Sequence, residues 1–151
     1  MTTAANRIIC VGNRYRPEDS AGPLTLAELQ ARRLPDGWAA LDGGLAGLDI
    51  LPSVEGARRV IFVDSILGDD GAVRVLSADD PLLHADAHYG HGAGLGYLLK
   101  LLPAVLKDEV PLLDVVGIPG QPDPELITAA ADACLSLASG GPGLEPHGGT
   151  R

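Results

Sequence analysis

Short apolar runs alternate with segments in which apolar residues recur at helical spacing, and this alternation predicts the order of elements. The apolar runs predict strands at residues 7–11, 38–41, 59–66, 72–76 and 112–118. The helical spacing predicts helices at residues 20–34, 48–54, 92–102 and 124–137. The run 72–76 follows its predecessor too closely for a helical crossover, so we expect it to be antiparallel. This order predicts a three-layer α/β/α sandwich with a mostly parallel, twisted sheet of about five strands.

Proline and glycine mark the predicted boundaries. Pro23 is early enough to fit the first turn of a helix, and Pro103 is expected to end or kink the Leu-rich helix. Residues 139–151 are rich in Gly and Pro, and we expect a flexible tail there. The length of 151 residues then fits a single domain over residues 1–138.

Charge and composition limit the possible partners. The chain has 11 basic and 20 acidic residues, a net charge of −9, and only 3% aromatic residues. This field repels phosphate polymers, so we expect no nucleic acid and no membrane as a partner. Neither a signal-peptide pattern nor an apolar run of about 20 residues is present, and the cytoplasm is the expected location. Cys10 and Cys134 lie among apolar residues and are expected to be free, buried thiols.

Four polar residues follow predicted strands or precede predicted helices. Asp19, preceded by Glu18, lies after the first strand; Asp42 follows the second strand, and Asp64 interrupts the end of the third. His91 directly precedes the Leu-rich helix, where it could equally be a helix-start residue without a ligand role. Ligand sites form at the carboxyl ends of parallel strands, so we expect these side chains to converge on one edge of the sheet.

Most of these residues also have an ordinary structural explanation. Asp19 could cap the following helix, and Asp42 beside two glycines could serve only the turn. Asp64 is harder to explain in this way, because an acid in an apolar central strand needs a partner, a proton or a metal. His84 and His88 are expected to be solvated loop residues.

Several common catalytic and binding motifs are missing from the sequence. It has no Gly-x-Gly-x-x-Gly fingerprint, no P-loop, no Gly-x-Ser-x-Gly elbow and no His-Glu-x-x-His. Dinucleotide binding, serine hydrolysis by that elbow and conventional zincin chemistry therefore lack their diagnostic residues.

Four motifs occur in an order that resembles a known family, the hydrogenase maturation endopeptidases. These enzymes trim the C-terminal extension from the large subunit of nickel-iron hydrogenases. The resemblance covers Arg7 to about Ser139. It rests on the Gly-Asn strand end and acid pair in residues 12–23, the Asp-Gly-Gly in 41–47, the apolar strand ending in Asp in 60–64, and the His before the Leu-rich helix in 91–99.

This resemblance implies a metal-contacting trio of Asp19, Asp64 and His91. The implied metal is nickel supplied by the substrate, a nickel-iron hydrogenase large-subunit precursor, and no permanent cofactor is expected. Asp42 is implied as a catalytic residue that positions the peptide or a water molecule. Glu18 remains an alternative to Asp19 as the ligand, because the residue after the acid pair is Ser where family members often have Gly. The metal could polarise the peptide carbonyl or activate water, and the sequence leaves both open.

Two other functions remain as alternatives. The first is a non-catalytic metal-binding or assembly scaffold protein on the same fold. The second, weaker alternative is a small-molecule hydrolase or nucleotide-binding α/β protein.

Overall fold

A five-stranded sheet forms the centre of the molecule. The computed structural model describes residues 4–66, 71–84 and 94–140. The strands are β1 (Asn6–Cys10), β2 (Trp38–Asp42), β3 (Arg59–Ile66), β4 (Arg74–Ser77) and β5 (Leu112–Pro119), in the order β2-β1-β3-β5-β4. All neighbouring pairs are parallel except β4 and β5, which are antiparallel. The predicted mostly parallel α/β fold is confirmed.

The antiparallel direction of β4 agrees with the sequence expectation. Its partner is β5, although β4 follows β3 along the chain. In register, Val75 of β4 lies opposite Val116 of β5. The strand β5 therefore lies between β3 and β4 in the sheet, although it follows both of them along the chain.

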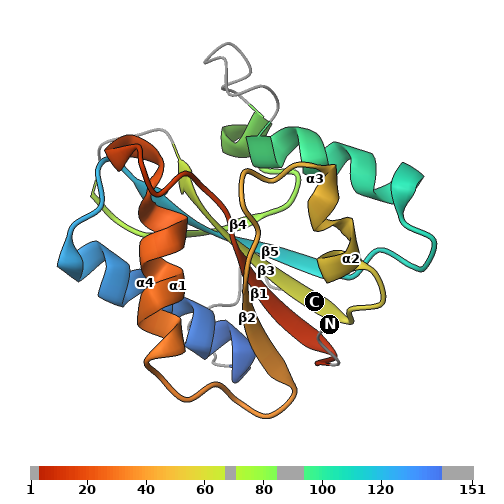
Figure 1. Cartoon of the computed structure of the whole chain (residues 1–151), viewed down its shortest axis with the longest axis horizontal. Helices are drawn as coiled ribbons and strands as arrows, with labels where there is room; N and C mark the ends of the chain where they lie inside the picture. The colour runs from red at the N-terminus through yellow and green to blue at the C-terminus, as the bar shows by residue number, and fades with distance from the viewer. Residues whose placement is uncertain (1–3, 67–70, 85–93, 141–151) are drawn as a thin grey trace.

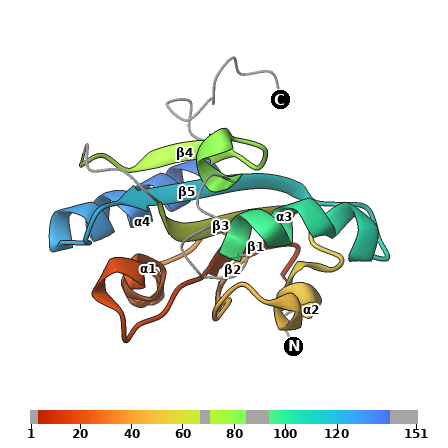
Figure 2. The same ribbon diagram turned by 90° about the horizontal axis from the view of Figure 1, so that it is seen from above.

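Helices cover both faces of the sheet, which gives three layers (Figures 1 and 2). One face carries α1 and α4, and the other carries α2 and α3. The α-helices are α1 (Ala21–Gln30), α2 (Leu51–Val54), α3 (Gly94–Val105) and α4 (Pro124–Ala138), and the 3-10 turns are η1 (Pro17–Asp19), η2 (Leu48–Ile50) and η3 (Pro81–His84). Among the described residues, no helix has the length and apolar character needed to cross a membrane.

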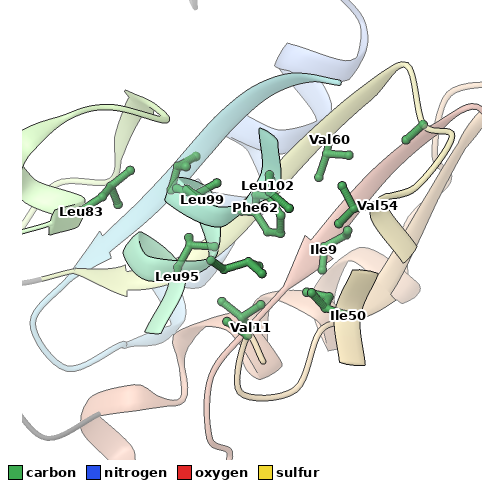
Figure 3. Packing of buried hydrophobic residues seen from close by; sticks show 14 of the residues in the cluster. Ile9, Val11, Ile50, Val54, Val60, Phe62, Leu83, Leu95, Leu99 and Leu102 are labelled. Atoms are coloured by element: carbon green, nitrogen blue, oxygen red, sulfur yellow. The ribbon is translucent and has the colours of Figure 1, made fainter. Parts of the chain in front are cut away.

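The core consists of two clusters because successive strand residues face opposite sides of the sheet. Ile8 and Ile61 pack toward α1 and α4, whereas Ile9 and Phe62 pack toward α2 and α3. Figure 3 shows Phe62 against the Leu side chains of α3. Phe62 is fully buried, and truncation of such a side chain typically costs about 3–5 kcal/mol.

Two helices end three or more residues away from the sequence expectation. Pro103 does not end its helix at Leu102, because α3 continues to Val105. Pro103 cannot donate to the carbonyl oxygen four residues earlier, and α3 ends two residues after it. The first helix ends at Gln30 instead of Leu34, and residues 31–37 form the return to β2.

Charged side chains stabilise the amino-terminal edge of the parallel strands. The buried Arg7 donates from Nη1 to the carbonyl oxygens of Ser53 at 2.9 Å and Glu55 at 3.0 Å. The nearly buried Asp114 accepts from Nη2 of Arg59 at 3.3 Å. No motif in the sequence marks these charges, which bind each other or backbone groups as buried charges must.

The helix α1 approaches the end of β1 very closely at Gly22. A Cβ atom on Gly22 would overlap the carbonyl oxygen and the amide of Val11. Pro23, in the first turn as predicted, lies beside Gly12, where a Cβ atom would be 3.1 Å from its Cδ. This contact sets how close the segment between β1 and α1 lies to the sheet.

We expect Gly22→Ala to destabilise the protein by about 1–3 kcal/mol or more, since the added methyl group must push α1 away from β1. Chemical denaturation followed by circular dichroism measures this change. Gly44→Ala is the control, because no atom lies within 4 Å of a Cβ atom there and only its positive φ of 58° opposes the substitution. If Gly22→Ala were no more costly than Gly44→Ala, the close approach would be contradicted.

Candidate active site

A cavity of about 340 Å³ lies at the carboxyl end of the parallel strands. Four parts of the chain line it: the segment after β1, the loop after β2, the end of β3, and η3 with the start of α3. The lining residues are Val11, Gly12, Asn13, Arg16, Asp19, Leu45, Ala46, Asp64, Ser65, Ile66, Leu82, Leu83, Gly94, Leu95 and Gly96. Two carboxylates, Asp19 and Asp64, are therefore brought to one cavity.

The segment after β1 is fixed by backbone hydrogen bonds. The amide of Asn13 donates to the carbonyl oxygen of Asp19 at 2.8 Å, and the amide of Asp19 donates to that of Arg16 at 2.8 Å. This closed loop holds the half-buried Asp19 at the cavity. The N-cap of α1 is Ser20, so the alternative that Asp19 is the N-cap of this helix is wrong.

Glu18 points to a different environment from its neighbour Asp19. Its Oε2 lies 3.0 Å from Nη2 of Arg16, and both side chains are 52% exposed. Glu18 does not belong to the cavity lining in the part of the chain that the structure describes. Of the two acids in the pair, Asp19 is the one that lines the same cavity as Asp64.

Asp64 lies near the end of the central strand β3. It is half-buried, directly after the fully buried Val63. Its Oδ1 accepts a hydrogen bond from the amide of Ser65 at 2.8 Å. The short apolar strand thus delivers a carboxylate to the cavity, as the sequence pattern predicts.

Asp42 stabilises the turn that it forms with its neighbouring glycines. Its Oδ1 accepts from the amide of Gly44 at 2.8 Å, and the side chain is exposed. Within residues 4–66, 71–84 and 94–140, it is not among the residues that line the cavity. Its turn instead delivers Leu45 and Ala46 to the lining, and its catalytic role stays a prediction.

The structure describes one of the three histidines of this region, His84. His88 and His91 lie outside the described residues. His84 is half-buried in η3, so the expectation of a solvated loop residue is wrong. Its Nε2 is 3.1 Å from the carbonyl oxygen of Ala78, which can only accept, so the proton is on Nε2. Its Nδ1 is buried and has no hydrogen-bond partner among the described residues.

The described residues supply two carboxylates but no complete metal-binding trio. In that part of the chain, no three His, Cys, Asp or Glu side chains form a group that could hold a metal ion. Asp19 and Asp64 share the cavity, whereas the third predicted ligand, His91, lies outside the described ranges.

Two further polar residues at the cavity were not singled out in the sequence. Arg16 is the only basic residue of the lining within the described ranges. The hydroxyl of Ser65 is buried without a hydrogen-bond partner among the same residues. The sequence does indicate the backbone conformation of Arg16, because the following Pro17 restricts it to the extended region. The structure shows this conformation, with φ −120° and ψ 111°.

A cysteine lies close to the cavity but is not poised as a nucleophile. Cys10 precedes the cavity-lining Val11 and is 1% exposed. Burial raises the pKa of the Cys10 thiol well above its usual value, and the nearby Cys134 and Asp42 add to the effect. Burial likewise raises the pKa of Cys134 to about 12. Because the thiolate is the reactive form, neither sulfur fits the nucleophile of a cysteine peptidase.

Known proteins are similar to this chain in sequence and in fold. Residues 23–133 match the HycI family model, hydrogenase maturation protease. The hydrogenase 3 maturation protease of Escherichia coli K12 is 32% identical over 120 residues, which cover 77% of this chain and 72% of that protein. The structure of the hydrogenase maturating endopeptidase HybD from E. coli superposes with a TM-score of 0.73 at 25% identity, covering 89% of this chain and 92% of that one. The maturation protease HycI from Thermococcus kodakarensis gives 0.66 at 18% identity, over 90% and 91% of the two chains, and shows the fold alone.

The matched family defines this protein as a peptidase with an α/β fold. The chain belongs to the hydrogenase maturation protease family. The resemblance stated from the four sequence motifs is thereby confirmed. The sequence left two alternatives, a non-catalytic scaffold and a small-molecule hydrolase or nucleotide-binding protein, and neither agrees with this membership.

Both thiols should resist alkylation in the folded protein. At pH 8 in iodoacetamide we expect no modification of Cys10 or Cys134 and unchanged peptidase activity, because burial keeps both thiols protonated. Intact-protein mass spectrometry gives the readout, and the protein in guanidinium chloride, which should gain two adducts, is the control. Rapid single alkylation with loss of activity would contradict this assignment.

Proposed function

We propose that this protein is the endopeptidase that removes the C-terminal extension of a nickel-iron hydrogenase large-subunit precursor after nickel insertion. The observation that carries the proposal is the placement of Asp19 and Asp64 in one cavity at the carboxyl end of the sheet. These are the two acids to which the family resemblance gives contact with metal. The third contact in this proposal is the imidazole of His91.

The chemistry of this donor set suits a divalent first-row metal. Two anionic oxygens and one imidazole fit nickel, whereas a thiolate cage would favour zinc or copper(I). Two carboxylates that share a cavity repel each other, and a cation between them removes this cost. A precursor that carries nickel therefore brings a cation that both acids can bind, and an empty precursor is expected to bind poorly.

The nickel in this proposal belongs to the substrate. Peptide cleavage then occurs only where the metal has been inserted, so the enzyme tests the precursor before it cuts. The metal can polarise the scissile carbonyl or lower the pKa of a bound water molecule, and both routes use the same ligands. In this proposal Asp42 positions the peptide or water through the loop that carries Leu45 and Ala46 to the cavity. We place the reaction in the cytoplasm.

The direct test is incubation of the purified protein with its nickel-loaded precursor. We expect a loss of mass at the precursor's C-terminus, measured by intact-protein mass spectrometry, and no cleavage of the same precursor prepared without nickel. Equal cleavage of both forms would contradict nickel recognition, and no cleavage of either form would contradict the proposed substrate.

Substitution of the acids tests which of them contact the metal. We expect Asp19→Asn and Asp64→Asn each to lower kcat/KM by at least about 100-fold, since loss of even an indirect metal contact costs about 10–100-fold. Glu18→Gln is the matched control for Asp19→Asn and should stay within about threefold, because its exposed ion pair contributes little. If Glu18→Gln abolished cleavage and Asp19→Asn did not, Glu18 would be the ligand.

His91→Ala should abolish cleavage without loss of the fold. The comparison is with His84→Ala, because His84 is not grouped with the two acids as a metal site within the described residues. Cleavage assays and thermal unfolding of both variants give the readout. Normal trimming by the His91 variant would remove this residue from the proposed trio.

A further inference from the structure

The cavity that holds the two acids also has a basic residue on its lining, Arg16. Neither the metal trio nor the loop role of Asp42 uses this residue. In a chain of net charge −9, Arg16 is the one basic residue of the described lining, which also contains two carboxylates. A cation there needs an anionic partner, and the question is what that partner is in the working enzyme.

Hydrogen bonds and a following proline fix the backbone of Arg16. Its amide donates to the carbonyl oxygen of Asn13 at 3.1 Å, and its own carbonyl oxygen accepts from the amide of Asp19 at 2.8 Å. The following Pro17 restricts the residue to its extended conformation. The amide of Tyr15 also donates to Oδ1 of Asn13, at 2.9 Å. Arg16 and the metal-facing Asp19 therefore belong to one closed loop. The hydrogen bonds of this loop fix the distance between their backbones.

The present partner of the guanidinium holds it weakly. Nε and Nη2 of Arg16 both donate to one oxygen, Oε2 of Glu18, at 3.0 Å each. Both side chains are 52% exposed. Such exposed pairs contribute about 0–1 kcal/mol, so a better-placed carboxylate can replace Glu18 at little cost. Arg also favours bidentate binding of a carboxylate, which the single Glu18 oxygen does not provide.

Exposed apolar side chains lie at the cavity and next to Arg16 in the chain. Leu45 belongs to the lining and is 68% exposed, and Tyr15, the neighbour of Arg16 in sequence, is 84% exposed. Exposed apolar side chains beside a cavity are typical of a surface that a partner covers. The cavity lining thus combines an exposed apolar side chain, a cation and two carboxylates, a combination that suits a polypeptide segment.

We infer that Arg16 binds a carboxylate group of the substrate segment that enters the cavity, and so selects substrates with a negative charge at that position. This inference rests on the proposed function and names the charge requirement of its substrate. The carboxylate comes either from an Asp or Glu side chain of the segment or from the C-terminus of the precursor. In both cases the guanidinium exchanges Glu18 for the substrate, and Arg16 acts in binding and not in bond cleavage.

Arg16→Gln in the full-length protein tests this assignment, with Arg14→Gln as the matched control. Arg14 is two residues away on the same loop, stacks on Tyr15 at 5.9 Å from the ring centre, and is not among the described residues that line the cavity. With the nickel-loaded precursor, we expect Arg16→Gln to raise KM by about 10-fold or more, because hydrogen bonds to charged groups contribute about that factor. We expect kcat to stay within about twofold, and Arg14→Gln to match the wild-type protein in both constants.

Neutral precursor variants identify the source of the carboxylate. One precursor has the acidic side chains of its extension changed to amides, and another carries four additional Gly-Ser residues that move its C-terminus away. The precursor that lacks the relevant carboxylate should show the raised KM with the wild-type enzyme and no further loss with Arg16→Gln. Equal losses for Arg16→Gln with the original, the amide and the extended precursors would overturn the carboxylate assignment.

The result for the wild-type protein separates this inference from the proposed function. A wild-type protein that neither binds nor cleaves the precursor overturns both. A wild-type protein that cleaves it, together with an Arg16→Gln variant of unchanged KM, overturns only the role of Arg16. Precursor binding, measured by interferometry at low and high salt, should show the same difference between the variants, and this difference should shrink as salt screens the charge.

Discussion

The contact between Gly22 of α1 and the backbone of Val11, just after β1, is the constraint on which the candidate active site depends. It holds α1 against the sheet and so limits the path of the residues between them. That short path is closed on itself by the bonds among Asn13, Arg16 and Asp19. The central strand independently carries Asp64 two residues before its end at Ile66, in register with Gly117 of β5. A carboxylate on a tightly closed loop and a carboxylate on a rigid strand therefore face one cavity without any long flexible connection between them.

The fold was largely predictable from sequence because a parallel sheet covered on both faces requires apolar runs that are easy to recognise. The run Val60–Val63 is fully buried in the central strand, as its composition predicts. The pairing of β4 with β5 was not predictable, because it depends on contacts between segments that are about 40 residues apart in β4 and β5. The extent of α3 past Pro103 was missed because proline was expected to end or kink the helix, whereas the helix continues for two residues beyond it. The Arg59 and Asp114 pair was missed because the two charges lie on different strands, 55 residues apart in sequence.

The site was predictable to a smaller extent. Asp19 and Asp64 follow from the rule that loops at the carboxyl ends of parallel strands form ligand sites. That rule does not distinguish a residue in the lining from one in a nearby turn, and Asp42 is in such a turn. His84 was expected in solvent, but the carbonyl of Ala78 binds it and Gly96 of α3 lies close to its ring. Burial of this kind arises from tertiary packing of distant segments, which local sequence patterns do not describe.

The two ends of the sheet carry different kinds of polar residue. Charges at the amino-terminal edge, such as Arg7 and its bonds to Ser53 and Glu55, fasten one part of the chain to another. Charges at the opposite edge lie on loops around the cavity. A substitution in a loop around the cavity can consequently change the lining while the fastened end of the sheet keeps the fold intact.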